Sequence, residues 1–280
     1  MKNFLLILIL VLASVLRLYK LSSYPAGLNA DEAALGYNAY SLLLTGKDEH
    51  GHPWPVNLES FGDFKPAGYA YLLIPFIKVF GLTEFAVRLP SALFGILGVL
   101  FIYLLTNEIF KNLEIENSLK IKNLELKIGH IAAAMLAVSP WHLHFSRGGW
   151  EVNVATTLIL IGAWLFLKKR FALCTLPFAL SMYTYQSARL IVPLMGLGLF
   201  FLYRPKRIFM AFVLGFLLLI PLTYNLVTTD AASRLSGVGL LADEGPLNRA
   251  KELRGQHPAW SSPLSRILHN RPVLYSIQFL

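Results

Sequence analysis

The chain has 280 residues, of which 55% are hydrophobic and 15% charged, whereas about a quarter of the residues in a soluble domain are charged. The apolar residues gather in long runs, which argues against a soluble protein and indicates membrane spans. The formal net charge of +9 comes largely from short loops between these runs, so we expect the bilayer, and no nucleic acid, as its partner. The single cysteine, Cys174, excludes an intrachain disulfide.

Seven apolar runs are candidate membrane spans. They are Asn3–Leu21, Glu84–Phe110, Ile128–Leu143, Val152–Leu167, Phe171–Tyr185, Leu190–Tyr203 and Ile208–Leu226. Several are shorter than the ~20 residues that an isolated span needs, which is acceptable inside a bundle. The first run follows Lys2 as in a signal peptide, but it lacks a small-residue cleavage site, so we expect an uncleaved span. The predicted fold class is therefore all-α, a polytopic transmembrane helix bundle.

Three short basic loops predict the orientation of this bundle. They lie within Lys111–Lys127, Lys168–Arg170 and Arg204–Arg207. Because positively charged loops stay in the cytoplasm, we place these loops and the N-terminus there. The predicted outer segments are 22–83, 144–151, 186–189 and 227–280, and the expected location is the plasma (inner) membrane.

The chain divides into two predicted parts. Residues 1–226 form the membrane module, and residues 227–280 form an outer loop and the start of a further span. That last apolar run, Leu274–Leu280, is shorter than any span, so we expect the chain to be truncated.

The first outer loop, residues 22–83, contains two predicted helices. Asn29 is a candidate N-cap, and Glu32 completes a capping box three residues later. An apolar stripe with helical spacing follows and ends at Thr45-Gly46, which predicts an amphipathic helix in the membrane interface. A second apolar stretch, Tyr69–Phe80, predicts another interfacial or partly inserted helix.

Ionisable residues gather on the predicted outer face, where they are costly beside a bilayer unless they are paired or functional. Asp31 and Glu32 either stabilise the helix start or act in catalysis. Lys65 lies before Pro66 and would hold a phosphate, although it would equally snorkel or pair with Asp63.

Two further outer segments carry charged candidates. In the predicted tight turn Ser139–Glu151, Arg147 and Glu151 either form a salt bridge or contribute to a site. Arg189 follows a second polar cluster.

Another acidic pair, Asp48 and Glu49, lies beside His50 and His52. These side chains suggest a metal site, but nothing in the spacing fixes its geometry. A solvated loop is therefore the favoured interpretation.

Four segments together resemble the C-type membrane glycosyltransferases, and more narrowly the branch of protein O-mannosyltransferases and aminoarabinose transferases. In order they are Leu28–Ala33 with Gly36-Tyr37 and Ala39–Ser41, Lys65–Leu72, Phe80-Gly81 with Ala86–Gly95, and Ser139-Pro140 with Ser146-Arg147. The resemblance implies a polyprenyl-phosphate sugar as donor and a protein, lipid or glycan as acceptor.

The resemblance also implies roles for the candidate residues. Asp31 would be the base that deprotonates the acceptor, Lys65 would contact the donor phosphate, and Glu151 stands where relatives often carry a second acid. Aminoarabinose transferases carry an arginine shortly after the acid, where this chain has Ala33 and Ala34, so Arg147 or Arg189 would supply that charge. The predicted catalytic residues are Asp31, Glu32 and Glu151, and the predicted phosphate-binding residues are Lys65, Arg147 and Arg189.

The predicted reaction is a single, inverting displacement by a membrane glycosyltransferase on the outer face. Phosphate is a competent leaving group, so one base and nearby cations are sufficient, and a divalent metal is possible without being required. The alternatives are a transporter or flippase for a lipid-linked glycan, which would carry polar groups deep in the membrane, and an inactive truncated scaffold.

Overall fold

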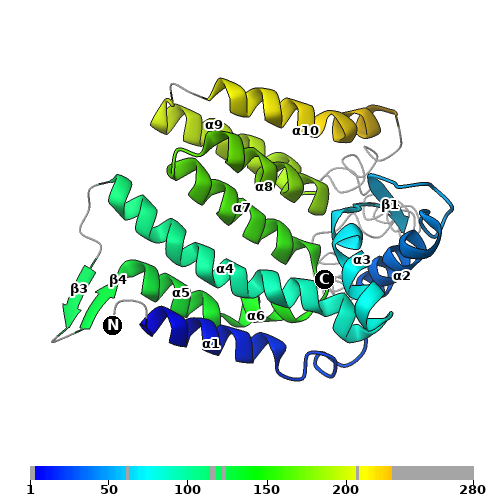
Figure 1. Ribbon diagram of the computed structural model, residues 1–280, viewed down its shortest axis with the longest axis horizontal. Coiled ribbons are helices and arrows are strands. Elements are labelled where there is room, and N and C mark those ends of the chain that lie inside the picture. The colour runs from blue at the N-terminus through cyan, green and yellow to red at the C-terminus, as the bar shows by residue number, and fades with distance from the viewer. Residues whose placement is uncertain (1–3, 61–62, 114–117, 122–123, 206–207, 229–280) are drawn as a thin grey trace, which may run out of the picture. The chain divides into compact units, whose positions relative to one another are not determined.

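The structure, a computed structural model, describes residues 4–60, 63–113, 118–121, 124–205 and 208–228. Within them the chain forms ten helices and two short antiparallel hairpins (Figure 1). The helices are α1 (Phe4–Leu18), α2 (Ala30–Thr45), α3 (Gly68–Phe80), α4 (Glu84–Asn112), α5 (Ile128–Val138), α6 (Pro140–Arg147), α7 (Glu151–Leu167), α8 (Phe171–Thr184), α9 (Ala188–Tyr203) and α10 (Phe209–Thr228). The hairpins pair β1 (Asn57–Ser60) with β2 (Asp63–Pro66) and β3 (Ser118–Ile121) with β4 (Leu124–Lys127).

The apolar helices pack side by side, with α4 at the centre of their arrangement (Figure 1). It contacts α1 and α5 on one side and α7 on the other, and α8 then connects α7 to α9 and α10. Close approach depends on glycine: a Cβ at Gly95 would lie 2.4 Å from the Ser146 Oγ, and one at Gly98 would lie 3.0 Å from the Thr157 Oγ1. The small residues of α4 thus allow α6 and α7 to approach its backbone.

The helical, apolar architecture agrees with the predicted membrane protein. Within the described part of the chain, two helices, α4 and α10, are long and apolar enough to cross a membrane, and α6 with α7 would form a third span bent by 113°. The other predicted spans are the shorter apolar helices α1, α5, α8 and α9. The all-α prediction missed both hairpins, one of which, β3–β4, lies in the segment that we expected to be a basic cytoplasmic loop.

The predicted span Ile128–Leu143 is wrong, because α5 ends at Val138 and α6 begins at Pro140. Proline has no N–H and its ring crowds the preceding helical turn, which favours an end of α5 at this point. Helices α4 and α8 nevertheless contain Pro90 and Pro177 in their interiors. Proline is instead favoured at the first position of a new helix, and the Ser139 side chain accepts a hydrogen bond from the His142 N–H. The predicted tight outer turn is therefore mostly a helix.

The two helices predicted in the first outer loop are confirmed. The Asn29 side chain accepts from the Glu32 N–H at 2.8 Å, and the Glu32 carboxylate accepts from the Asn29 N–H at 3.0 Å. Gly46 ends α2 in the left-handed conformation, with φ +70°. Helices α2 and α3, strand β1 and parts of α4 and α7 enclose one apolar core. The predicted outer loop and further span at 227–280 lie outside the described residues, except for Val227 and Thr228.

Candidate functional site

The first turn of α2 and strand β2 bring Asp31 and Lys65 together. The Lys65 ammonium donates a hydrogen bond to the Asp31 carboxylate, and the two form an ion pair. The lysine side chain is only 12% exposed, whereas the aspartate side chain is 40% exposed. The ammonium is therefore sheltered by the protein, whereas the carboxylate remains accessible to solvent.

Local structure explains the position of each partner. Asp31 lies in the first turn of α2, where the positive end of the helix dipole favours a carboxylate. Lys65 faces Leu58 in the β1–β2 register, and Leu58 is buried in the apolar core that α2 shares. The hairpin thus fixes the backbone of Lys65 against the helix that carries Asp31.

Glu32, the next residue, is buried and has a different set of partners. Its Oε1 accepts from the Arg88 Nε at 2.9 Å and from the Gly149 N–H at 2.7 Å. Its Oε2 accepts from the Asn29 N–H at 3.0 Å and from the Arg88 Nη2 at 3.3 Å. The side chain is 2% exposed, so these donors surround a carboxylate that solvent barely reaches.

Arg88, which sequence reasoning did not select, is the partner of Glu32 and is fully buried in α4. It also donates to the carbonyls of Pro25, at 2.7 Å, of Leu21, at 3.3 Å, and of Gly27. One arginine thus ties α4 to α2 and to the segment between α1 and α2. An arginine inside an apolar run was the signal that could have identified it.

Glu151 begins α7 and lies near the same buried region. Burial, followed by the charges of Glu151 and Glu32, raises the pKa of Tyr69 well above its usual value. The neutral Tyr69 hydroxyl donates to the Val87 carbonyl at 2.8 Å. Both predicted acids therefore act electrostatically on one tyrosine of α3.

Arg147 lies at the end of α6 and binds backbone carbonyls. Its Nη1 donates to the Leu16 carbonyl at 2.6 Å, and its Nη2 donates to those of Tyr19 and Tyr24 at 2.9 and 3.0 Å. The last carbonyls of a helix lack intrahelical partners, so Arg147 caps the carboxyl end of α1. All of these acceptors lie between residues 16 and 24, so the hydrogen bonds of Arg147 do not include the Asp31 carboxylate that pairs with Lys65.

Arg189 begins α9 and joins three elements. It donates to the Met182 carbonyl at 3.1 Å and to the Asn57 Oδ1 at 2.6 Å, and Asn57 also contacts Asn225 of α10. Successive strand residues point to opposite faces, so Asn57 and Lys65, the partner of Leu58, project from opposite faces of the hairpin. Arg189 is therefore on the face that Lys65 does not use.

The acidic pair at the end of α2 stabilises a folded loop. Asp48 is buried, and its Oδ1 accepts from the His50 and His52 N–H groups at 3.0 and 2.8 Å. Glu49 exchanges hydrogen bonds with the Asn38 side chain. Among the described residues, no group of three or more His, Cys, Asp or Glu side chains could hold a metal ion.

Residues 64–115 match the model of the dolichyl-phosphate-mannose-protein mannosyltransferase family. The predicted resemblance is confirmed over this segment. It runs from β2 through α3 to α4 and contains Lys65 and Arg88, whereas Asp31 precedes it. No curated protein matches the chain significantly. The match and the apolar helices together support a membrane glycosyltransferase of the C type.

Proposed function

We propose that this chain transfers a sugar from a polyprenyl-phosphate donor to a protein, lipid or glycan acceptor on the outer face of the membrane. The observation that carries the proposal is the ion pair between Asp31 and Lys65. It combines an accessible carboxylate with a sheltered cation at the head of an outer-loop helix, and the family match includes the lysine. These are the two charges that transfer from a lipid phosphate requires.

In the proposed reaction, Asp31 is the general base and Lys65 binds the donor phosphate. Asp31 accepts the proton as the acceptor oxygen, or another nucleophilic atom, forms a bond to the anomeric carbon. The bond from that carbon to the phosphate oxygen breaks, and its electron pair leaves with polyprenyl phosphate. The Lys65 ammonium stabilises the negative charge on the leaving phosphate. Attack opposite the leaving group inverts the anomeric carbon.

The ion pair also explains how the proposed base is held in position before the donor binds. In the absence of donor, the Lys65 ammonium holds the Asp31 carboxylate in place. An ammonium has three N–H donors, so Lys65 can contact a phosphate oxygen without releasing Asp31. Donor binding would therefore bring the phosphate close to the base, with the anomeric carbon between the phosphate and the acceptor.

The remaining predicted site residues have other roles in this proposal. Glu32 acts through Arg88 as a positioning residue for the first turn of α2, and we remove it from the catalytic set. Arg147 binds backbone carbonyls at the end of α1, and Arg189 binds the Met182 carbonyl and the Asn57 side chain, so neither is assigned to the phosphate. Glu151 remains the second acid; it lies in the first turn of α7, and its charge, like that of Glu32, acts on Tyr69.

A divalent metal would have Asp31 and the donor phosphate as its ligands in this arrangement. The described residues near Asp31 do not provide the group of three or more carboxylate, imidazole or thiolate ligands that would hold such an ion by themselves. We therefore write the reaction with Lys65 as the cation that meets the phosphate.

The proposal requires the Asp31–Lys65 pair to face the outside of the plasma membrane. In a Cys174→Ala background, we expect His50→Cys to react with an impermeant maleimide in intact cells. Lys111→Cys, near the C-terminal end of α4, should react only after the membrane is permeabilised. Labelling of Lys111→Cys in intact cells would place the proposed site on the wrong face.

The activity itself is tested by deleting the gene and measuring lipid-linked sugars by mass spectrometry. We expect one polyprenyl-phosphate sugar to accumulate and to disappear when the wild-type protein is restored. When the double variant Asp31→Asn with Lys65→Ala is expressed instead, the polyprenyl-phosphate sugar should remain at its accumulated level. The matched control is Glu84→Gln with Lys47→Ala, which removes the same two charges from exposed positions and should clear it.

The same experiment separates a transferase from a flippase. A transferase releases polyprenyl phosphate and leaves the sugar on an acceptor, whereas a flippase leaves the lipid-linked sugar intact. No accumulation after deletion, or clearance by the double variant at normal membrane levels, would contradict the proposal.

A further inference from the structure

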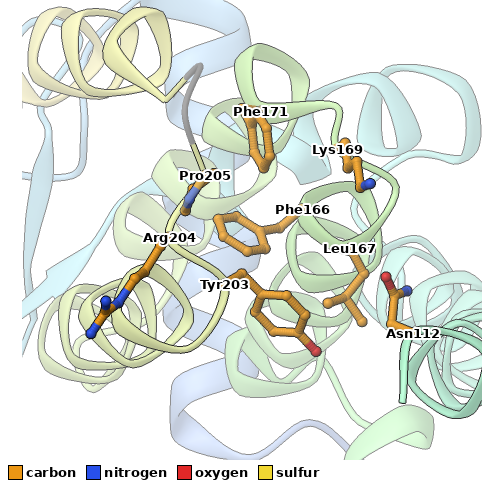
Figure 2. A pocket seen from close by; sticks show the side chains of 8 residues that line it. All are labelled: Asn112, Phe166, Leu167, Lys169, Phe171, Tyr203, Arg204 and Pro205. Carbon is orange, nitrogen blue, oxygen red and sulfur yellow. The ribbon is translucent and has the colours of Figure 1, made fainter. Parts of the chain in front are cut away.

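A second feature lies at the opposite end of the long helices, away from Asp31 and Lys65. A cavity of about 470 Å³ opens where α4, α7 and α9 end and α8 begins (Figure 2). Its lining includes Asn112, Phe166, Phe171 and Tyr203, together with Lys169 from the α7–α8 loop and Arg204 after α9.

The position of this cavity is that of a membrane interface. At a rise of about 1.5 Å per residue, Arg88 and Asn112 lie roughly 36 Å apart along α4. That distance is comparable with the ~30 Å hydrocarbon core of a bilayer. The cavity is therefore one bilayer away from the proposed active site, at the level where the apolar helices stop.

The cavity carries two cations without partners among the described residues. Lys168 illustrates the contrast, because its ammonium bonds the Glu108 carboxylate at 2.6 Å. Within the described part of the chain, the Lys169 and Arg204 side chains have neither a hydrogen bond nor an ion pair. Both are exposed, and both have left-handed backbones, with φ +58° and +41°. Glycine is the usual residue at such helix ends, so long cationic side chains there suggest a function.

The wall of the cavity is aromatic. The Phe166 ring meets the Phe171 ring edge to face at 5.2 Å and the Tyr203 ring at 6.0 Å between centroids. Figure 2 shows Lys169 and Arg204 on opposite sides of these rings. A molecule that lies against the rings therefore has a cation at either edge, with the Asn112 amide and the Tyr203 hydroxyl as further polar groups.

From this arrangement we propose that the cavity binds the phosphate headgroup of an anionic phospholipid in the inner leaflet. The phosphate would meet Lys169 through a charge-assisted hydrogen bond, and Arg204 would add a favourable charge at the other edge of the rings. The glycerol and first acyl carbons would lie against the aromatic rings. A free phosphate ester would use the cations but not the aromatic wall, which favours the lipid. The site does not depend on the transfer reaction.

Native mass spectrometry of the full-length protein, purified in detergent, tests this proposal. The protein is titrated with phosphatidylglycerol or with phosphatidylcholine, and the retained lipids are counted. We expect preferential retention of phosphatidylglycerol. Glycerol 3-phosphate at the same concentration should not displace it. Equal retention of the two lipids, or displacement by glycerol 3-phosphate, would overturn the proposal without any variant.

Variants then locate the site. Lys169→Ala with Arg204→Ala should lower the affinity for phosphatidylglycerol by at least about tenfold, because one charge-assisted hydrogen bond and a second favourable charge are lost. The matched control, Lys47→Ala with Lys78→Ala, removes two exposed lysines of the first outer loop and should leave the affinity unchanged. A double variant that retains the lipid as the wild type does, or a control with the same loss, would show that the lipid binds elsewhere.

Discussion

Asp31 and Glu32 are neighbours in the first turn of α2, yet their surroundings are opposite. Glu32 is 2% exposed and accepts hydrogen bonds from Arg88, Asn29 and Gly149. Asp31 is 40% exposed and pairs with Lys65. Adjacent residues of a helix diverge by about 100°, so one acid faces the helix packing and the other faces outward. We therefore propose that Glu32 serves stability and Asp31 serves chemistry, and substitutions can separate the two roles.

The largest effect on stability is expected from Arg88→Ala. Removing one partner of a buried ion pair leaves the other charge unpaired and destabilises a protein by ~3–5 kcal/mol. We expect a loss of this size in denaturant unfolding of the detergent-purified protein. Lys78→Ala, an exposed lysine of α3, serves as control and should change stability little. An Arg88→Ala protein as stable as the control would show that the buried pair contributes nothing.

Lys65→Ala should affect transfer rather than folding. A charge-assisted hydrogen bond to phosphate contributes about 1.5–3 kcal/mol, so the efficiency with the lipid-linked donor should fall by one to two powers of ten. Lys65→Arg should recover part of this loss because it keeps the charge but not the compact ammonium. The apparent affinity for the acceptor should change much less.

The outcome that would contradict this role is an unchanged donor saturation curve for Lys65→Ala. Lys47→Ala is the control, since it removes an exposed lysine from the same loop. An equal loss in both variants would indicate a general charge effect on donor approach.

Arg147→Ala tests whether the arginine caps α1 or binds donor. Loss of its hydrogen bonds to the carbonyls of Leu16, Tyr19 and Tyr24 should lower stability by ~1–3 kcal/mol. Transfer per folded molecule should remain near that of the wild type. If donor efficiency instead falls as far as in Lys65→Ala, Arg147 contacts the phosphate, as the sequence analysis predicted.

The smallest effect is expected from Asn29→Ala, which removes the side-chain cap of α2. Loss of an N-cap destabilises by ~1 kcal/mol, and Asn29→Ser should restore most of it. The Asn29 N–H still donates to Glu32 in both variants, so thermal unfolding should show a modest, graded change. A loss as large as that of Arg88→Ala would mean that the cap also fixes the buried pair.

The features that the sequence predicted well are local ones. The N-cap Asn29, the capping-box residue Glu32 and the terminal Gly46 belong to one helix and interact over a few residues. Their pattern therefore contains the information that determines where α2 begins and ends. Likewise, apolar runs predicted the helices because hydrophobicity is a property of each segment alone.

Most of the features that the sequence analysis missed depend on residues that are distant in the sequence. One, the break between α5 and α6, had a local signal. Arg88 meets Glu32 across 56 positions, and Arg147 reaches the end of α1 across more than 120, so no local pattern assigns these partners. The segment alone suggested a donor-binding role for Arg147, and it could not reveal the hydrogen bonds of Arg147 to carbonyls at the end of α1. The break between α5 and α6 was predictable in principle, because Ser139-Pro140 is a helix start signal inside an apolar run.

The measurement that tests the central claim most directly compares Asp31→Asn with Glu32→Gln in one assay. Both substitutions remove one carboxylate charge from the same turn, so net charge and position are matched. For each variant, turnover of the accumulated lipid-linked sugar is measured per folded molecule, together with unfolding in denaturant. We predict that Asp31→Asn lowers turnover by about 10²–10⁴-fold with a change in stability below ~1 kcal/mol, while Glu32→Gln mainly loses stability. Full turnover in Asp31→Asn would contradict the assignment of Asp31 as the base.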